Sequence, residues 1–131
     1  MYELHVETEF AAAHFLRGYA GRCERLHGHN WRVQAALQAR KLDKLGMAID
    51  FKEATALLMK VIDAFDHRNL NDLPAFKKDN PTTENVSRVI YNELSKRLPP
   101  GVTVKSVTTW ESERCGATYL PAIRLAGSKG D

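Results

Sequence analysis

The sequence predicts an α+β fold in the order β-β-α-α-β-β, and three observations support this prediction. Apolar and polar residues alternate near both ends of the chain, apolar residues recur at helical spacing between them, and short clusters of Gly, Pro or Asn separate the segments. We expect one four-stranded antiparallel sheet with both helices on one face.

The first two strands carry the clearest alternation. Residues 2–10 alternate between mostly apolar and mostly acidic side chains, the pattern of a half-buried strand. The stretch AAAHF ends this strand at His14, and residues 17–24, with two glycines, predict a loop. Residues 29–39 then alternate again, with one apolar and one mostly polar face, and predict the second strand.

Helix-start signals place the two helices. Asp50 and Glu53 resemble a capping box, and the apolar residues behind them predict a helix over about 50–65. Residues 69–80 are polar and predict a loop. The sequence Pro-Thr-Thr-Glu at 81–84 begins the second helix, and Pro-Pro-Gly at 99–101 ends it.

Residues 102–113 and 117–125 predict the last two strands, joined by a short turn. We expect a single domain over residues 1–126 and a disordered tail over 127–131. An open four-stranded sheet has unpaired edges, and oligomerisation through them is one way to cover them.

Composition narrows the class of protein. The chain has 131 residues, of which 44% are hydrophobic and 27% charged, as in a globular domain. The net charge of +3 is spread along the chain, which indicates no nucleic-acid partner and suits an anionic small molecule. Two cysteines are too few for a disulfide framework, and no stretch resembles a signal peptide or a membrane span. We expect a cytoplasmic protein with no membrane partner.

Three histidines are candidate metal ligands. His27 and His29 are two residues apart at the start of a strand, so their side chains point to the same side. If the first two strands form a hairpin, His14 lies close to both. Three histidines with a fourth position open are the catalytic pattern for zinc. The alternative is that His27 and His29 are loop and strand-end residues without a metal.

Cys23 allows three interpretations. It can be a fourth zinc ligand, a small hydrophobic residue, or a reactive thiol activated by a nearby histidine or cation. Its charged neighbours in a glycine-containing loop argue against burial, but they do not separate a ligand from a reactive thiol.

Asp66, His67 and Glu111 have both a structural and a functional interpretation. Asp66 and His67 can simply end a helix, or His67 can transfer a proton while the carboxylate orients it. Glu111 can be exposed on a strand, or its carboxylate can accept two N–H donors from a guanine-like ring edge.

Five short motifs occur in an order that identifies a family. They are FAAAH with His14, C-x-x-x-H-G-H with Cys23, His27 and His29, FDHRNLN with Asp66 and His67, PTTEN, and WES with Glu111. Over residues 2–125 the chain resembles the 6-pyruvoyltetrahydropterin synthase / 6-carboxytetrahydropterin synthase family.

The resemblance implies the T-fold, or tunnelling fold, whose sheets join edge to edge into a barrel. It also implies a homohexamer built as a dimer of trimers, with active sites between subunits. Zn²⁺ would be held by His14, His27 and His29, and Cys23 would be a catalytic proton acceptor. Asp66 and His67 would form a relay that generates the thiolate, Glu111 would anchor the pterin and join the relay, and Thr82 and Thr83 would line the substrate pocket.

The short spacing between Cys23 and His27 is similar to that of the 6-carboxytetrahydropterin synthases of queuosine (7-deazaguanine) biosynthesis. This similarity implies conversion of 7,8-dihydroneopterin triphosphate to 6-carboxytetrahydropterin with release of acetaldehyde and triphosphate. One alternative is a pyruvoyl-forming enzyme that eliminates triphosphate. The other is a non-catalytic zinc-binding module with Cys23 as fourth ligand.

Overall fold

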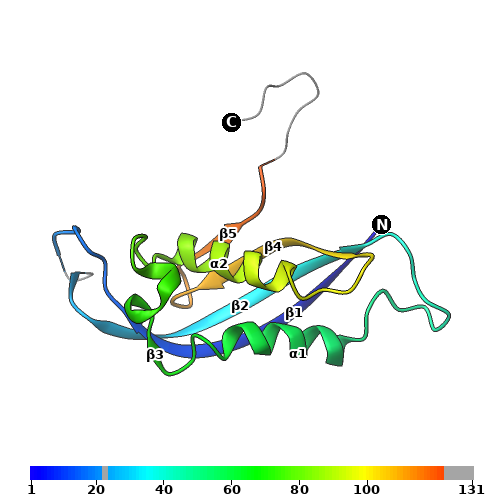
Figure 1. Ribbon diagram of the computed structural model, residues 1–131, viewed down its shortest axis with the longest axis horizontal. Helices are drawn as coiled ribbons and strands as arrows, with labels where there is room; N and C mark the ends of the chain where they lie inside the picture. Colours follow the sequence, from blue (N-terminus) through cyan, green and yellow to red (C-terminus); the bar gives the residue numbers. More distant parts are fainter. Residues whose placement is uncertain (22–23, 123–131) are drawn as a thin grey trace, which may run out of the picture.

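One sheet with two helices on one of its faces makes up the fold (Figure 1). The structure is a computed structural model that describes residues 1–21 and 24–122. The strands are β1 (Tyr2–His14), β2 (His27–Ala39), β3 (Arg68–Asn69), β4 (Val102–Trp110) and β5 (Gly116–Tyr119), and the helices are α1 (Phe51–Ile62) and α2 (Thr83–Ser95). The predicted α+β class is confirmed.

The hairpin of β1 and β2 forms the centre of the sheet, whose strand order is β3-β1-β2-β4-β5. The two strands are antiparallel and pair along their whole length, from Tyr2 opposite Ala39 to His14 opposite His27. Strand β4 pairs antiparallel with β2, and β5 pairs antiparallel with β4. The end of the hairpin that carries His14 and His27 therefore has a fixed register.

The prediction of four antiparallel strands was incomplete, because the sheet has a fifth strand that is parallel to its neighbour. The two residues of β3 run beside Ala12 and Ala13 of β1. A two-residue strand has no alternation to reveal it in the sequence, and its pairing depends on where the chain lies after α1.

Both helices begin at a side-chain cap, and the cap of α1 at Asp50 was predicted. Asp50 accepts a hydrogen bond from the backbone N–H of Lys52 at 2.8 Å, and Thr82 accepts one from that of Asn85 at 3.1 Å. Helix α1 ends earlier than the predicted residue 65, because the chain continues in turns after Ile62. Two short 3₁₀ turns, Leu70–Asp72 and Pro74–Phe76, lie in the predicted loop.

The core lies between the helices and one face of the sheet. Alternate residues of β1 and β2 point into it, and Trp31 and Val33 are fully buried there. Phe10 stacks on Trp31 with ring centroids 5.7 Å apart. The opposite face of these strands is polar and not covered by the helices.

The last two strands are shorter than predicted. Strand β4 ends at Trp110 rather than at residue 113, and β5 covers Gly116–Tyr119. The predicted disordered tail, residues 127–131, lies outside the described residues. No helix in the described part of the chain is long and apolar enough to cross a membrane.

Candidate metal centre

Three histidine side chains meet where β1 ends and β2 begins. His14 and His27 are register partners in the hairpin, and His29 follows on the same side of β2 as His27. One ring nitrogen from each histidine lies within 4.8 Å of the other two. The structure thus brings together the three residues that the sequence singled out as ligands.

Backbone carbonyl groups orient two of the rings. His14 Nδ1 lies 2.7 Å from the carbonyl oxygen of Pro81, and His27 Nδ1 lies 2.7 Å from that of Arg25. Because a carbonyl oxygen only accepts hydrogen bonds, Nδ1 carries the proton in each ring and Nε2 keeps its lone pair. Metal-binding histidines commonly donate their other ring nitrogen in this way.

Two Nε2 atoms lack a hydrogen-bond partner in the described ranges, although they are buried. They belong to His14 and His29. The three rings face one another edge-on, with centroids 4.6 to 5.1 Å apart. A buried polar atom without a partner is costly, so lone pairs that converge in this way are typical of a metal site.

Burial favours the form of these imidazoles that binds metal. Removal from water lowers the pKa of His14, and it lowers the pKa of His29 although the Glu111 carboxylate opposes that shift. A histidine must be neutral to bind a metal ion. Three neutral imidazole nitrogens are the ligand set of several catalytic zinc sites, so the residues present fit a zinc ion.

Glu111 lies beside the histidine cluster, just after β4. The hydroxyl of Thr83, at the start of α2, donates to Oε1 of Glu111 at 2.5 Å. The other carboxylate oxygen lies 3.6 Å from His29 Nε2. The Glu111 side chain remains about one-third exposed, so a ligand bound near the histidines can reach it.

The two threonines predicted to line the pocket differ in their surroundings. Thr83 is buried and bonded to Glu111, which places it at the candidate site. The hydroxyl of Thr82 instead accepts the backbone N–H of Asn85 and caps α2. The described structure therefore gives Thr82 a role in helix formation.

Asp66 and His67 form a second pair in the turns that follow α1. His67 Nδ1 lies 3.0 Å from Asp66 Oδ2, and the His67 side chain is 81% exposed. The pair is tied to β1, because the N–H of Ala11 donates to Asp66 and the N–H of His67 donates to the Ala11 carbonyl. The Ala11 hydrogen bond, aided by His67, lowers the pKa of Asp66.

His67 lines a hollow of about 460 Å³ together with small residues of the hairpin. Ala11, Ala13 and Gly28 form much of its wall, and these positions alternate with the core-facing residues of β1 and β2. His67 is thus presented outward.

Cys23, the predicted proton acceptor, lies outside the described residues, so its position relative to the histidines stays a prediction. The guanidinium group of Arg17, which follows the first strand, donates to the carbonyl groups of Phe76 and Asp79. Cys115 is exposed in the turn between β4 and β5.

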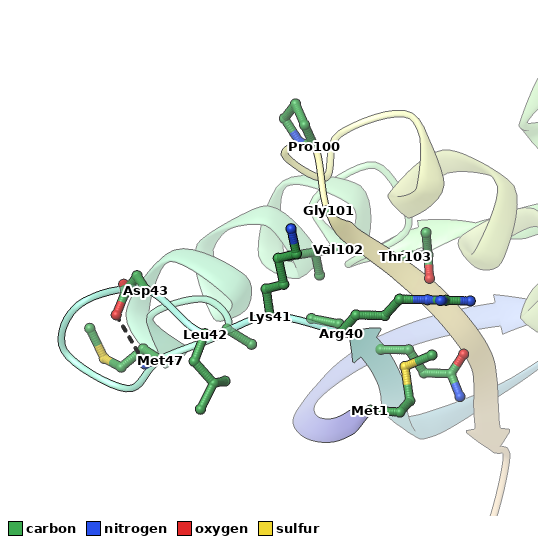
Figure 2. A pocket seen from close by; sticks show the side chains of 13 residues that line it. Met1, Arg40, Lys41, Leu42, Asp43, Met47, Pro100, Gly101, Val102 and Thr103 are labelled. Carbon is green, nitrogen blue, oxygen red and sulfur yellow. Dashed lines mark hydrogen bonds between the residues drawn. The ribbon is translucent and has the colours of Figure 1, made fainter.

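A second cavity, of about 620 Å³, lies at the other end of the sheet (Figure 2). Its wall includes Met1, the end of β2 and the start of β4, and it has both charged residues, Arg40 and Lys41, and apolar ones, Leu42 and Met47. None of the predicted catalytic or metal-binding residues lines it, so its size does not make it the candidate site.

Sequence reasoning missed the groups that hold the candidate site together. They are the carbonyl group of Pro81, which orients His14, and the side chains of Asn71 and Asn80, which bind the backbone just after His14. Asn71 and Asn80 lie 56 and 63 residues from their partners, so no local pattern reveals these contacts.

Comparison with known proteins gives consistent matches. Residues 3–122 match the family described as 6-pyruvoyl tetrahydropterin synthase. A Rickettsia typhi protein named 6-carboxy-5,6,7,8-tetrahydropterin synthase is 32% identical, with 82% of this chain and 91% of that protein covered. A Pyrococcus furiosus protein named dihydroneopterin monophosphate aldolase is 34% identical, with 83% and 89% covered.

A solved structure has the same fold. The Caenorhabditis elegans 6-pyruvoyl tetrahydropterin synthase superposes with a TM-score of 0.83 at 27% identity, covering 92% of this chain and 96% of that one. The predicted T-fold is therefore confirmed by both the strand arrangement and this likeness.

Proposed function

Because the chain belongs to the 6-pyruvoyl tetrahydropterin synthase family, we propose that it is a zinc-dependent 6-carboxy-5,6,7,8-tetrahydropterin synthase. Its substrates are 7,8-dihydroneopterin triphosphate and one molecule of water, and the products are 6-carboxytetrahydropterin, acetaldehyde and triphosphate. The observation that carries the proposal is the convergence of three imidazole nitrogens beside the carboxylate of Glu111. The names of relatives and the short C-x-x-x-H-G-H spacing favour the carboxy product.

His14, His27 and His29 would hold the zinc ion through Nε2 of each ring. Zinc bound there supplies Lewis-acid chemistry, which acidifies hydroxyl groups on the substrate side chain. Glu111 orients the substrate by accepting N–H donors of the pterin ring, and the Thr83 hydroxyl fixes the carboxylate for this task.

Cys23 takes a proton from the substrate side chain as a thiolate, and His67 exchanges the proton with solvent or product. Asp66 holds His67 through its Nδ1, so that Nε2 is the atom that accepts or donates the proton. The exposure of His67 supports this role for a substrate held by a neighbouring subunit.

We propose a homohexamer, a dimer of trimers, in which the sheets join edge to edge. Within the described residues, β1 has a strand partner on its outer side only at Ala12 and Ala13, and β5 is the last strand of the sheet. These edges leave backbone N–H and C=O groups for a second copy. We further propose that the enzyme acts in the cytoplasm and supplies queuosine biosynthesis.

Product analysis tests the proposed reaction. Incubation with 7,8-dihydroneopterin triphosphate should release acetaldehyde and triphosphate in equal amounts. A pyruvoyl product without acetaldehyde would instead support a pyruvoyl-forming enzyme. Turnover of dihydroneopterin monophosphate alone would support the activity for which the Pyrococcus furiosus relative is named.

The Cys23→Ala variant separates an enzyme from a zinc-binding module. If Cys23 transfers protons, the variant keeps its zinc and loses turnover. If Cys23 is a fourth ligand, the variant loses zinc as well, and the catalytic assignment fails. Cys115→Ala is the matched control, because Cys115 is exposed in a turn.

A further inference from the structure

Two asparagine side chains hold the backbone that follows His14. Asn71 Oδ1 accepts the N–H of Phe15 at 2.9 Å, and Asn71 Nδ2 donates to the carbonyl oxygen of Phe15 at 3.0 Å. Asn80 makes the same pair of bonds with Arg17, at 2.9 and 3.0 Å. We refer to these four hydrogen bonds as the carboxamide clamp.

The clamp replaces a strand partner. In an antiparallel ladder, alternate residues exchange both hydrogen bonds with the neighbouring strand, and Phe15 and Arg17 are such alternate residues. Strand β3 pairs with β1 only as far as Ala13, and beyond that point the clamp supplies the hydrogen-bond partners of the backbone. A carboxamide suits this position because it carries both a donor and an acceptor, which an ionised carboxylate or an apolar side chain does not.

The clamp is well fixed on its own side. Asn71 is buried, with 4% of its surface exposed, and its backbone N–H donates to Asn69 Oδ1. The carbonyl oxygen of Asn80 accepts a bond from Asn85 Nδ2 at 2.9 Å. The backbone of each asparagine is therefore fixed by hydrogen bonds other than those that its carboxamide makes with residues 15–17.

His14 lies immediately before the clamped segment. Its backbone precedes the clamped Phe15, and its ring is bonded to Pro81, the residue after Asn80. Two positions further along, Thr83 holds Glu111. Residues 80–83 thus fix both the ring of His14 and the carboxylate beside the histidine cluster.

We propose that Asn71 and Asn80 are positioning residues that hold His14 in place as a metal ligand. This inference rests on the proposed function, because it requires the metal centre. A ligand that is already oriented loses less freedom when metal binds, so groups behind the ligands contribute to metal affinity. The side chains of both asparagines bond to the backbone, so they would act through His14 and not as metal ligands.

Asn71→Asp and Asn80→Asp test the proposal in the full-length metal-free protein. Each change keeps the size and one acceptor but loses the donor and brings a negative charge against a backbone carbonyl group. We expect zinc affinity, measured by competition with a chromogenic chelator, to fall about 10- to 100-fold. Asn92→Asp, on the exposed side of α2, is the matched control and should leave affinity within about twofold.

A double-mutant cycle separates positioning from general destabilisation. In a His14→Ala background, Asn80→Asp should no longer change zinc affinity, because the ligand that it positions is absent. In a His27→Ala background the loss should persist. An equal loss in both backgrounds would overturn the proposal.

Folding is checked by circular dichroism of the metal-free variants. If Asn80→Asp does not fold, Asn80→Ser takes its place, and a smaller loss of affinity in the same direction is expected. Wild-type zinc affinity in every folded clamp variant would overturn the inference alone. Failure of the wild-type protein to bind zinc would overturn the proposed metal centre, and the inference with it.

Discussion

Glu111 lies between the start of α2 and the histidine cluster that we propose as a metal centre. One carboxylate oxygen accepts a bond from Thr83, and the other faces His29. The Glu111 side chain therefore links the start of α2 to the histidine cluster. Its charge, rather than its size, should determine how well a pterin ring binds.

Glu111→Gln should lower kcat/KM about 10- to 100-fold, because a hydrogen bond to a charged acceptor contributes roughly 1.5–3 kcal/mol. The loss should appear mainly in KM, measured by steady-state kinetics with the triphosphate substrate. Glu113→Gln removes a charge at an exposed position two residues away and should leave kcat/KM unchanged. An unaffected kcat/KM in Glu111→Gln would contradict the role of Glu111 as an anchor.

Asp66 should make the stability of the protein depend on pH. The N–H of Ala11 and the ring of His67 hold the pKa of Asp66 below its ordinary value of 3.8. A carboxyl group whose pKa is lower in the folded state stabilises the fold above its unfolded pKa, and this stability is lost as pH falls through the folded value.

We therefore expect the urea midpoint of the wild-type protein to exceed that of Asp66→Asn at neutral pH, and the gap to close once pH falls below 3.8. The carboxamide oxygen of this variant can still accept the Ala11 bond, so the comparison isolates the charge. The control Asp63→Asn replaces an exposed carboxylate just after α1, and it is measured at the same pH values. A constant gap for Asp66→Asn would contradict this explanation.

The start of α2 carries two adjacent threonines with different tasks. Thr82 caps the helix, and Thr83 bonds to Glu111. Because the clamp residue Asn80 and the carbonyl group of Pro81 immediately precede them, the beginning of this helix orients one side of the histidine cluster.

Thr82→Ala should lower the free energy of unfolding by about 0.5–2 kcal/mol, the usual contribution of an N-cap side chain. Urea unfolding of the metal-free protein at a fixed subunit concentration measures it. Thr82→Ser keeps the hydroxyl and should retain most of the stability. If Thr82→Ala instead raised KM with stability unchanged, Thr82 would be a substrate contact, as the family resemblance implies.

The elements that the sequence predicted best are those with a repeating local pattern. Alternation in residues 2–10 and 29–39 identified β1 and β2, and the capping signal at Asp50 located the start of α1. Strand β3 and the carboxamide clamp depend on contacts between distant segments, which no local pattern encodes. The histidine cluster was predictable because pairing of the two strands follows from their order.

The whole molecule presents His67 outward while its histidine cluster lies between strands and the start of a helix. The pair of Asp66 and His67 is anchored to β1 at Ala11, so it is well placed but exposed. A relay with this geometry suits a site that is completed by a second copy of the chain.

Mixing two inactive variants tests this arrangement. His14→Ala lacks a proposed metal ligand and His67→Ala lacks the proposed proton relay, so each should be inactive alone. After joint refolding in equal amounts, about a quarter of wild-type activity should return, because a shared site needs one intact contribution from each of two neighbours. Refolding either variant by itself is the control, and no recovery in the mixture would place the whole site in one chain.

If the histidine cluster binds zinc as proposed, the register of β1 and β2 makes zinc binding depend on correct folding of the hairpin. Neighbouring residues of a strand point to opposite faces, so a hairpin that slipped by one residue would turn His14 away from His27 and His29. Such a misfolded hairpin would keep its backbone hydrogen bonds but lose the cluster of three imidazole nitrogens. Since a ligand stabilises only the state that binds it, zinc would increase the population of the correctly paired hairpin over the slipped one.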